Sequence, residues 1–150
     1  MIYQATTKDY NAVREFNNKL LEQHYGYDTF TWKQSYDMSM STFSQYCKRG
    51  NLYIMYQDDY VGFAYCTVRQ VDSNEQKRHR NFNIEKFYID TKYRGKGYSK
   101  MFLDFLEDIA WNKNCDSIKV ASYLENEDAM KTYEAFGFKQ QYVEFIKVRK

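Results

Sequence analysis

The sequence contains no proline, few cysteines and histidines, and almost no net charge, and these shortages exclude several classes of protein. Because 22 basic residues stand against 20 acidic ones, the formal net charge is only +2 and the chain as a whole offers no electrostatic basis for binding nucleic acid. Basic residues gather only in 77–80 and 92–100. We therefore expect no nucleic-acid partner, and any phosphate binding must be local.

The three cysteines, Cys47, Cys66 and Cys115, are widely spaced and form no Cys-x-x-Cys pair. This spacing indicates neither a disulfide framework nor a zinc site. Neither of the two histidines lies in a recognisable metal-binding or nucleophile arrangement. We therefore expect no metal, and the cysteine usage favours a reducing, cytoplasmic location.

Long apolar runs are also absent, and the first residues lack the basic and apolar regions of a signal peptide. We expect no membrane partner. The 150 residues contain no repeat, low-complexity tract or Gly/Ser linker, so a single domain over 1–150 is predicted, long enough to bury a core. Aromatic residues make up 19% of the chain, which favours a core and clefts built from rings and suits small-molecule recognition.

Hydrophobic periodicity predicts alternating strands and helices. Helices are expected from Asp9 to before Gly26, as one or two short segments within 25–49, over 98–110, and between Asn126 and Gly137. The expected strands are 1–5, 51–56, 61–68, 81–90, 117–121 and 141–148. This order is that of an α/β (α+β) protein with a mostly antiparallel first half.

The most informative stretch is 84–98, which combines a strand, a basic loop and the start of a helix. Backbone N–H groups at a helix start lack intrahelical partners and lie at the positive end of the macrodipole. Gly95 and Gly97 remove the Cβ atoms that would keep a pyrophosphate away from these donors. Three side chains of the loop add positive charge, namely Lys92, Arg94 and Lys96. An isolated Gly-x-Gly is also typical of an ordinary strand-to-helix turn, so the loop alone leaves both interpretations open.

Two common nucleotide-binding signatures are missing from this loop. There is no Gly-x-x-x-x-Gly-Lys-Ser/Thr, and Lys100 replaces the third glycine of Gly-x-Gly-x-x-Gly. Residues 92–97 instead resemble the Q/R-x-x-G-x-G/A pyrophosphate motif of the GNAT superfamily of N-acetyltransferases, with Lys92 in place of the usual Gln or Arg. Residues 126–138 are similar to the late helix of that family, including its Tyr-Glu-x-x-Gly-Phe ending.

The resemblance implies a GNAT fold, with a central mixed, mostly antiparallel sheet of about six or seven strands flanked by about four helices. It also implies acetyl-CoA as cosubstrate, no metal, and direct attack of an amine on the thioester in a ternary complex, without an acyl-enzyme. The residues that it assigns to coenzyme A are Tyr88 and Ile89 on a bulged fourth strand, Lys92, Arg94, Gly95, Lys96, Gly97, Tyr98 and Ser99 in the loop and helix start, and Asn126.

Two residues are catalytic candidates by the same resemblance. Tyr133 would protonate the departing thiolate, since a phenol with a pKa near 10 keeps its proton at neutral pH. A core tyrosine on a helix is the alternative. Glu85 matches the carboxylate of the I/L-E-D-F/L-Y/F-V strand of polyamine and related acetyltransferases, where Ile-Glu-Lys-Phe-Tyr-Ile stands here, and would accept the proton of the substrate ammonium. A solvent-facing strand carboxylate is the competing interpretation.

The acceptor region is the least diagnostic part of the chain. Rings edged by carboxylates occur within 22–37, namely Tyr25, Tyr27, Phe30, Trp32 and Tyr36 with Glu22, Asp28 and Asp37. They favour a small cationic amine such as an aminoglycoside or polyamine, although ordinary packing also explains most of them. A peptide or protein N-acetyltransferase and a non-catalytic acyl-CoA-binding module remain alternatives. GNAT proteins often dimerise through late strands, so the resemblance also leaves a homodimer open.

Overall fold

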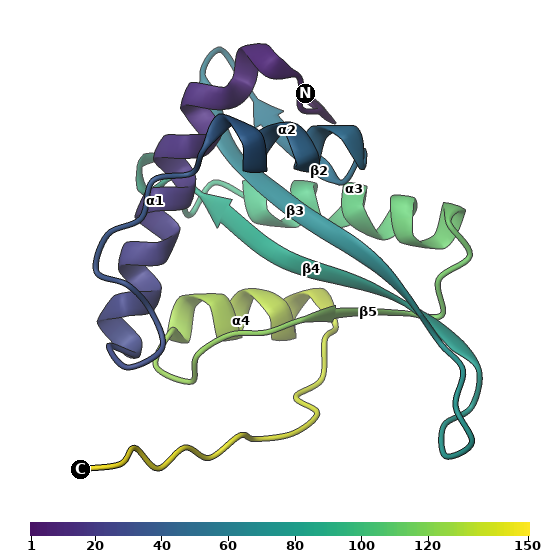
Figure 1. Ribbon diagram of the computed structural model, residues 1–150. Coiled ribbons are helices and arrows are strands. Elements are labelled where there is room, and N and C mark those ends of the chain that lie inside the picture. Colours follow the sequence, from purple (N-terminus) through teal and green to yellow (C-terminus); the bar gives the residue numbers. More distant parts are fainter.

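A five-stranded sheet forms the centre of the computed structural model, which describes residues 1–150 (Figure 1). The strands lie in the order β1-β2-β3-β4-β5, and their bounds are β1 (Ile2–Gln4), β2 (Leu52–Tyr56), β3 (Tyr60–Val71), β4 (His79–Ile89) and β5 (Ser117–Val120). All neighbours are antiparallel except β4 and β5, which are parallel. The mixed, mostly antiparallel sheet of an α/β protein is therefore confirmed, but with five strands where six or seven were expected.

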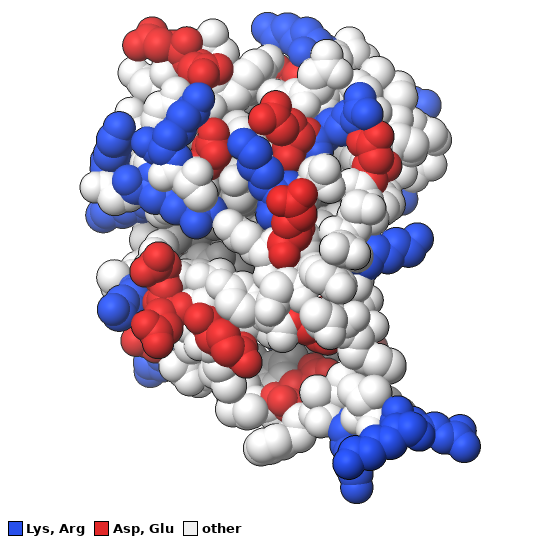
Figure 2. Space-filling model, turned by 90° about the vertical axis from the view of Figure 1, so that its left-hand side faces the viewer, with Lys and Arg blue, Asp and Glu red and all other residues white.

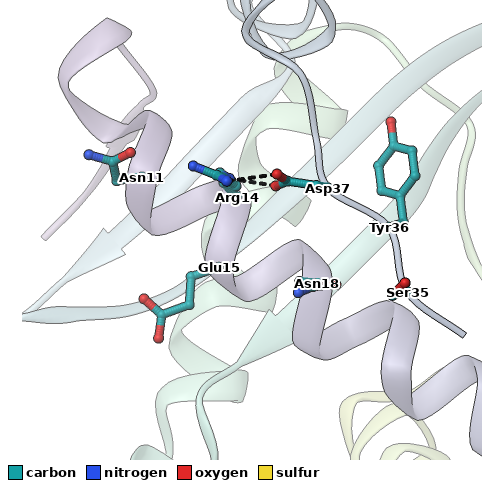
Figure 3. A pocket seen from close by; sticks show the side chains of 7 residues that line it. All are labelled: Asn11, Arg14, Glu15, Asn18, Ser35, Tyr36 and Asp37. Carbon is teal, nitrogen blue, oxygen red and sulfur yellow. Dashed lines mark hydrogen bonds and ion pairs between the residues drawn. The ribbon is translucent and has the colours of Figure 1, made fainter.

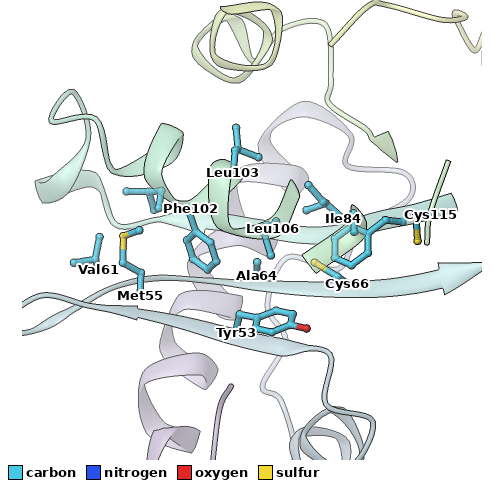
Figure 4. Close-up of a cluster of buried hydrophobic side chains, with 13 residues drawn as sticks. Tyr53, Met55, Val61, Ala64, Cys66, Ile84, Phe102, Leu103, Leu106 and Cys115 are labelled. Atoms are coloured by element: carbon cyan, nitrogen blue, oxygen red, sulfur yellow. The ribbon is translucent and has the colours of Figure 1, made fainter. Parts of the chain in front are cut away.

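Four α-helices cover the two faces of this sheet, and their bounds are α1 (Tyr10–Tyr27), α2 (Met40–Lys48), α3 (Tyr98–Asn112) and α4 (Glu127–Phe136). The alternation of side chains along β2 explains the two layers, because Leu52 and Ile54 pack with α1 and α2 whereas Tyr53 and Met55 pack with α3. Figure 4 shows the α3 side of this core, where Phe102 and other side chains of α3 lie against the sheet. No helix combines the length and the hydropathy needed to cross a membrane.

The expected final strand over 141–148 is wrong. Residues after Phe138 take part in no backbone hydrogen bond and are all exposed, with Tyr142 at 80% and Phe145 at 91% exposure. Figure 1 shows this segment leaving the end of α4 and running away from the sheet. Alternating apolar residues raise the propensity for a strand, but a strand forms only where another strand edge is within reach.

Candidate active site

Strands β4 and β5 pair over a short stretch and then separate. Their register runs from Asn81 with Ser117 to Ile84 with Val120, whereas β4 continues to Ile89. The backbone of residues 85–89, the open stretch of β4, therefore has no strand partner on the β5 side, and its polar groups on that side are left unpaired by the sheet.

A β-bulge marks the start of this open stretch. Tyr65 of β3 pairs with Lys86, and the next residue, Cys66, pairs with Ile84, so Glu85 is the additional residue of β4. The Glu85 side chain is exposed, and its Oε1 accepts a hydrogen bond of 2.7 Å from the Thr67 hydroxyl. The bulge thus places this carboxylate at the point where β4 loses its partner.

After β4 the chain turns tightly into α3. A short 3-10 helix, η2 (Thr91–Tyr93), follows, and the Arg94 Nε–H donates a hydrogen bond of 2.9 Å back to the carbonyl oxygen of Ile89. Gly95 and Gly97 then adopt φ angles of 76° and 83°, the left-handed region that residues with a Cβ enter at a cost. A Cβ built on either glycine meets no atom within 4 Å, so this side of the loop is open.

The backbone N–H groups of residues 95–100 donate no hydrogen bond within the protein. The first N–H of the helix start that does so is that of Met101, which donates to the Gly97 carbonyl at 3.2 Å. These free donors lie at the positive end of the α3 macrodipole. In the same loop the ammonium groups of Lys92 and Lys96 lie 5.3 and 5.7 Å from the centre of the Tyr93 ring, and that of Lys92 also forms an ion pair of 3.4 Å with Asp59. Such an arrangement fits a diphosphate, including that of coenzyme A.

The surface of this side of the molecule is consistent with an anion site. Figure 2 views the side that lies on the left of Figure 1, onto which the end of β4 and the starts of α3 and α4 open. Lysine and arginine side chains gather on one side of a hollow there, and acidic side chains lie on the other. The positive potential is therefore local, as the near-zero net charge requires.

Tyr133 lies on α4 beside the open stretch of β4. The centre of its ring is 6.4 Å from that of Phe87 and 5.7 Å from that of Phe138. Burial raises the pKa of Tyr133 to about 12, so the phenol is protonated at neutral pH. Its hydroxyl has no hydrogen-bond partner in the protein and remains available as a donor.

Asn126 caps the N-terminus of α4. Its Oδ1 accepts a hydrogen bond of 3.2 Å from the Ala129 N–H, which is an N-cap interaction. Only its amide nitrogen is then free to donate to a ligand. Tyr133 on α4 thus lies beside the unpaired part of β4, and that strand leads directly into η2 and the glycine loop before α3.

The acceptor residues expected from the sequence are only partly brought together. A cavity of about 270 Å³ lies between α1, the following segment, α2 and β4. Its lining consists of Leu21, Thr31, Trp32, Lys33, Tyr36, Met38, Tyr46 and Lys86. Trp32 and Tyr36 are therefore in place, but none of the expected carboxylates lines this cavity, and Lys86 was not expected.

Those carboxylates have other partners or lie elsewhere. Asp28 accepts hydrogen bonds from the Tyr123 hydroxyl at 3.1 Å and from the Thr31 N–H at 3.0 Å. Asp37 forms a two-point ion pair with Arg14, at 2.5 and 2.6 Å, in a second, polar hollow of about 540 Å³ (Figure 3). That hollow is lined by Asn11, Arg14, Glu15, Asn18, Ser35, Tyr36 and Asp37. A sequence pattern could not reveal this pairing, because Arg14 and Asp37 are far apart in the chain.

Comparison with known proteins supports an acetyltransferase. The model of the Acetyltransferase (GNAT) family matches residues 12–138. The spermine/spermidine N(1)-acetyltransferase of Bacillus subtilis (strain 168) is 28% identical over 138 residues, which cover 90% of this chain and 85% of that protein.

Solved structures agree in fold. A mutant of the BH1408 protein from Bacillus halodurans superposes with a TM-score of 0.90 at 16% identity, over 99% of both chains. The aminoglycoside N-acetyltransferase AAC(6')-Iy in complex with CoA superposes with a TM-score of 0.74 at 18% identity, over 100% of both chains. At these identities the two structures show a shared fold.

Proposed function

We propose that this chain, which belongs to the Acetyltransferase (GNAT) family, acts as one domain over residues 1–150 and transfers the acetyl group of acetyl-CoA to a primary amine of a small molecule. The observation that carries the proposal is the row of free N–H groups at residues 95–100, on a loop whose two left-handed glycines leave its front open. A diphosphate satisfies several of these donors at once.

In this proposal the open edge of β4 holds the rest of the cosubstrate. The backbone at Tyr88 and Ile89 hydrogen-bonds the amides of the pantetheine arm, and an N–H of this edge stabilises the negative charge that develops on the thioester oxygen. Asn126 adds its free amide nitrogen, and Lys92 and Lys96 add positive charge near the diphosphate. This role for the edge is supported by its lack of a strand partner after Ile84.

Tyr133 is the proposed general acid. The amine nitrogen attacks the thioester carbon, the carbon–sulfur bond breaks, and the phenol gives its proton to the departing thiolate. The half-buried ring beside β4 and the unpartnered hydroxyl support this role.

Glu85 is the proposed acceptor of the proton that the substrate ammonium must lose before attack. Its position on the bulge, at the start of the open stretch, supports this role. In Glu85→Gln the pH–rate profile is expected to shift, because the base is lost while the side-chain size is kept. A profile identical to that of the wild type would exclude Glu85 as the base.

The first acceptor class to test is a small cationic amine, because the similar proteins include a spermine/spermidine N(1)-acetyltransferase and an aminoglycoside N-acetyltransferase. The cavity lining, which contains no carboxylate, gives such a polycation no electrostatic support. The test is thiol release from saturating acetyl-CoA across polyamines, aminoglycosides, amino acids and peptides. Acetylation of peptide α-amines or protein lysines alone would favour the peptide or protein enzyme, and tight CoA binding without turnover on any amine would favour the non-catalytic module.

A homodimer and a cytoplasmic location complete the proposal. The dimer is supported by the exposed apolar side chains of 141–148 and by the unpaired outer edge of β5, since pairing between two copies would bury both. Light scattering should find a dimer for the full chain and a monomer after removal of residues 139–150; a monomeric full chain would contradict the proposed dimer.

The proposed cytoplasmic location is supported by the three cysteines, which are present as free thiols.

A further inference from the structure

The charges that line the 270 Å³ cavity are all positive. Lys33 and Lys86 contribute ammonium groups, and no aspartate or glutamate is part of the lining. A second positive charge on a bound polyamine would therefore be repelled there. An anionic group on the ligand would be attracted.

Lys86 is held in place within this lining. Its Nζ donates a hydrogen bond of 2.6 Å to Oδ1 of Asn17, a fully buried residue of α1. No carboxylate lies within ion-pair distance of Lys86, and its remaining N–H groups have no protein acceptor. Burial lowers the pKa of Lys86, in line with an ammonium that lacks a counterion. A ligand carboxylate would supply the missing acceptor.

The cavity shares strand β4 with the proposed reaction centre, on the opposite face of the sheet: Lys86 faces α1, whereas the next residue, Phe87, faces α3 and lies beside Tyr133. Lys86 follows the bulge residue Glu85 and belongs to the same open stretch of β4 as Tyr88. A molecule whose anionic group pairs with Lys86 can therefore direct its amine along β4 towards the thioester.

The size and walls of the cavity narrow the ligand further. About 270 Å³ is just below the roughly 300–1,000 Å³ of pockets that hold drug-sized molecules, so a compact acceptor fits best. Rings of Trp32, Tyr36 and Tyr46 and the aliphatic side chains of Leu21 and Met38 form much of the lining. These walls suit an acceptor with an apolar middle between its charged ends.

We propose that the acceptor is a compact amine that also carries a carboxylate, of the amino-acid type, and that Lys86 selects it by pairing with that carboxylate. This inference rests on the proposed acetyltransferase function and replaces a polyamine by an amino acid as its acceptor. Asn17 is a positioning residue, because it fixes the Lys86 ammonium at the cavity wall.

The test compares acceptors that differ only in the carboxylate. Thiol release from saturating acetyl-CoA is measured for L-lysine against cadaverine, L-ornithine against putrescine, and L-tyrosine against tyramine. The carboxylate member of at least one pair should have a kcat/KM at least about tenfold higher than its partner, the size of effect that one charge-assisted hydrogen bond produces. In Lys86→Met that ratio should fall to about one, mainly through the KM of the amino acid, with the KM of acetyl-CoA unchanged.

Two variants accompany this measurement. Lys86→Arg keeps the charge and should retain a preference for the carboxylate member, which also guards against a folding defect in Lys86→Met. Lys33→Met removes the exposed lysine of the same lining and should change the ratio less. The acceptor assignment would be overturned if the wild type had equal kcat/KM for the diamines and the amino acids, or if Lys86→Met left the ratio unchanged. Either result would leave the acetyltransferase proposal intact. No thiol release with any member of any pair would overturn the acceptor assignment, and no thiol release across the whole panel of amines would overturn the acetyltransferase as well.

Discussion

Replacing Gly97 by alanine separates the role of the loop in folding from its role in binding. Gly97 has a φ of 83°, and an alanine in the left-handed region costs about 1–2 kcal/mol. No clash adds to this cost, because a Cβ at this position meets no atom within 4 Å. The melting temperature should therefore fall by only about 2–8 °C in a domain of this size.

The expected effect on CoA binding is larger. The added methyl group enters open space at the loop that carries the free N–H groups of residues 95–100, and we expect it to keep a phosphate from at least one of them. A hydrogen bond to a charged group contributes about 1.5–3 kcal/mol, so the Kd for CoA should rise about 10- to 150-fold. Isothermal titration calorimetry with CoA measures this directly.

Gly50→Ala is the matched control. Gly50 has a similar φ of 67°, but it precedes β2, and its added Cβ would contact only the flexible end of Gln4, at 3.4 Å. This variant should lose similar stability and keep the wild-type Kd for CoA. Equal CoA affinities for Gly97→Ala and Gly50→Ala would refute the assignment of the loop to the diphosphate.

Three further outcomes are expected. Tyr133→Phe should lower kcat about 10²-fold, the low end for a general acid because a thiolate is a fair leaving group, with the Kd for CoA unchanged; steady-state kinetics and calorimetry check this. Because burial raises the pKa of Tyr133 to about 12, the phenol keeps its proton as the pH rises through 10, and wild-type kcat should show no fall there that depends on Tyr133. A fall of wild-type kcat near pH ~10 that is absent in Tyr133→Phe would contradict the raised pKa. Gly62→Ala would place a Cβ 2.2 Å from the Tyr88 carbonyl oxygen and force β3 and β4 apart, so urea unfolding should show a loss of about 2–4 kcal/mol; a loss below about 0.5 kcal/mol would show that the strands absorb the methyl group.

Local patterns predicted the parts of the fold that depend on local physics. The apolar period over 98–110 is a property of one helix, and it appears as α3 with Phe102 and Leu106 fully buried. The two glycines before it were interpretable because left-handed backbone is a requirement of single residues. The free N–H groups follow from the helix start itself.

Features that depend on contacts between distant parts of the chain could not be predicted from the sequence. Residues 141–148 can form a strand only if the edge of another strand lies within hydrogen-bonding reach. Their alternating pattern does not show whether such an edge is near, so the predicted strand was wrong. The lysine of the cavity wall depends on the register of β4 against α1, which joins Lys86 to Asn17 across 69 positions of the chain. The ion pair between Asp37 and Arg14 likewise depends on the path of the segment after α1, which the sequence pattern does not give. Of the three carboxylates that seemed to edge one pocket in the sequence, only Asp37 lines a hollow, and that hollow is not the cavity that Trp32 lines.

The most direct test of the central claim is a titration of ¹⁵N-labelled protein with CoA, followed through backbone amide resonances. The amides of residues 95–100, which donate to no protein acceptor, should show the largest shifts, and inorganic pyrophosphate alone should move the same set. If saturating CoA leaves those amide resonances in place while it shifts others, the diphosphate binds elsewhere and the account of this site is wrong.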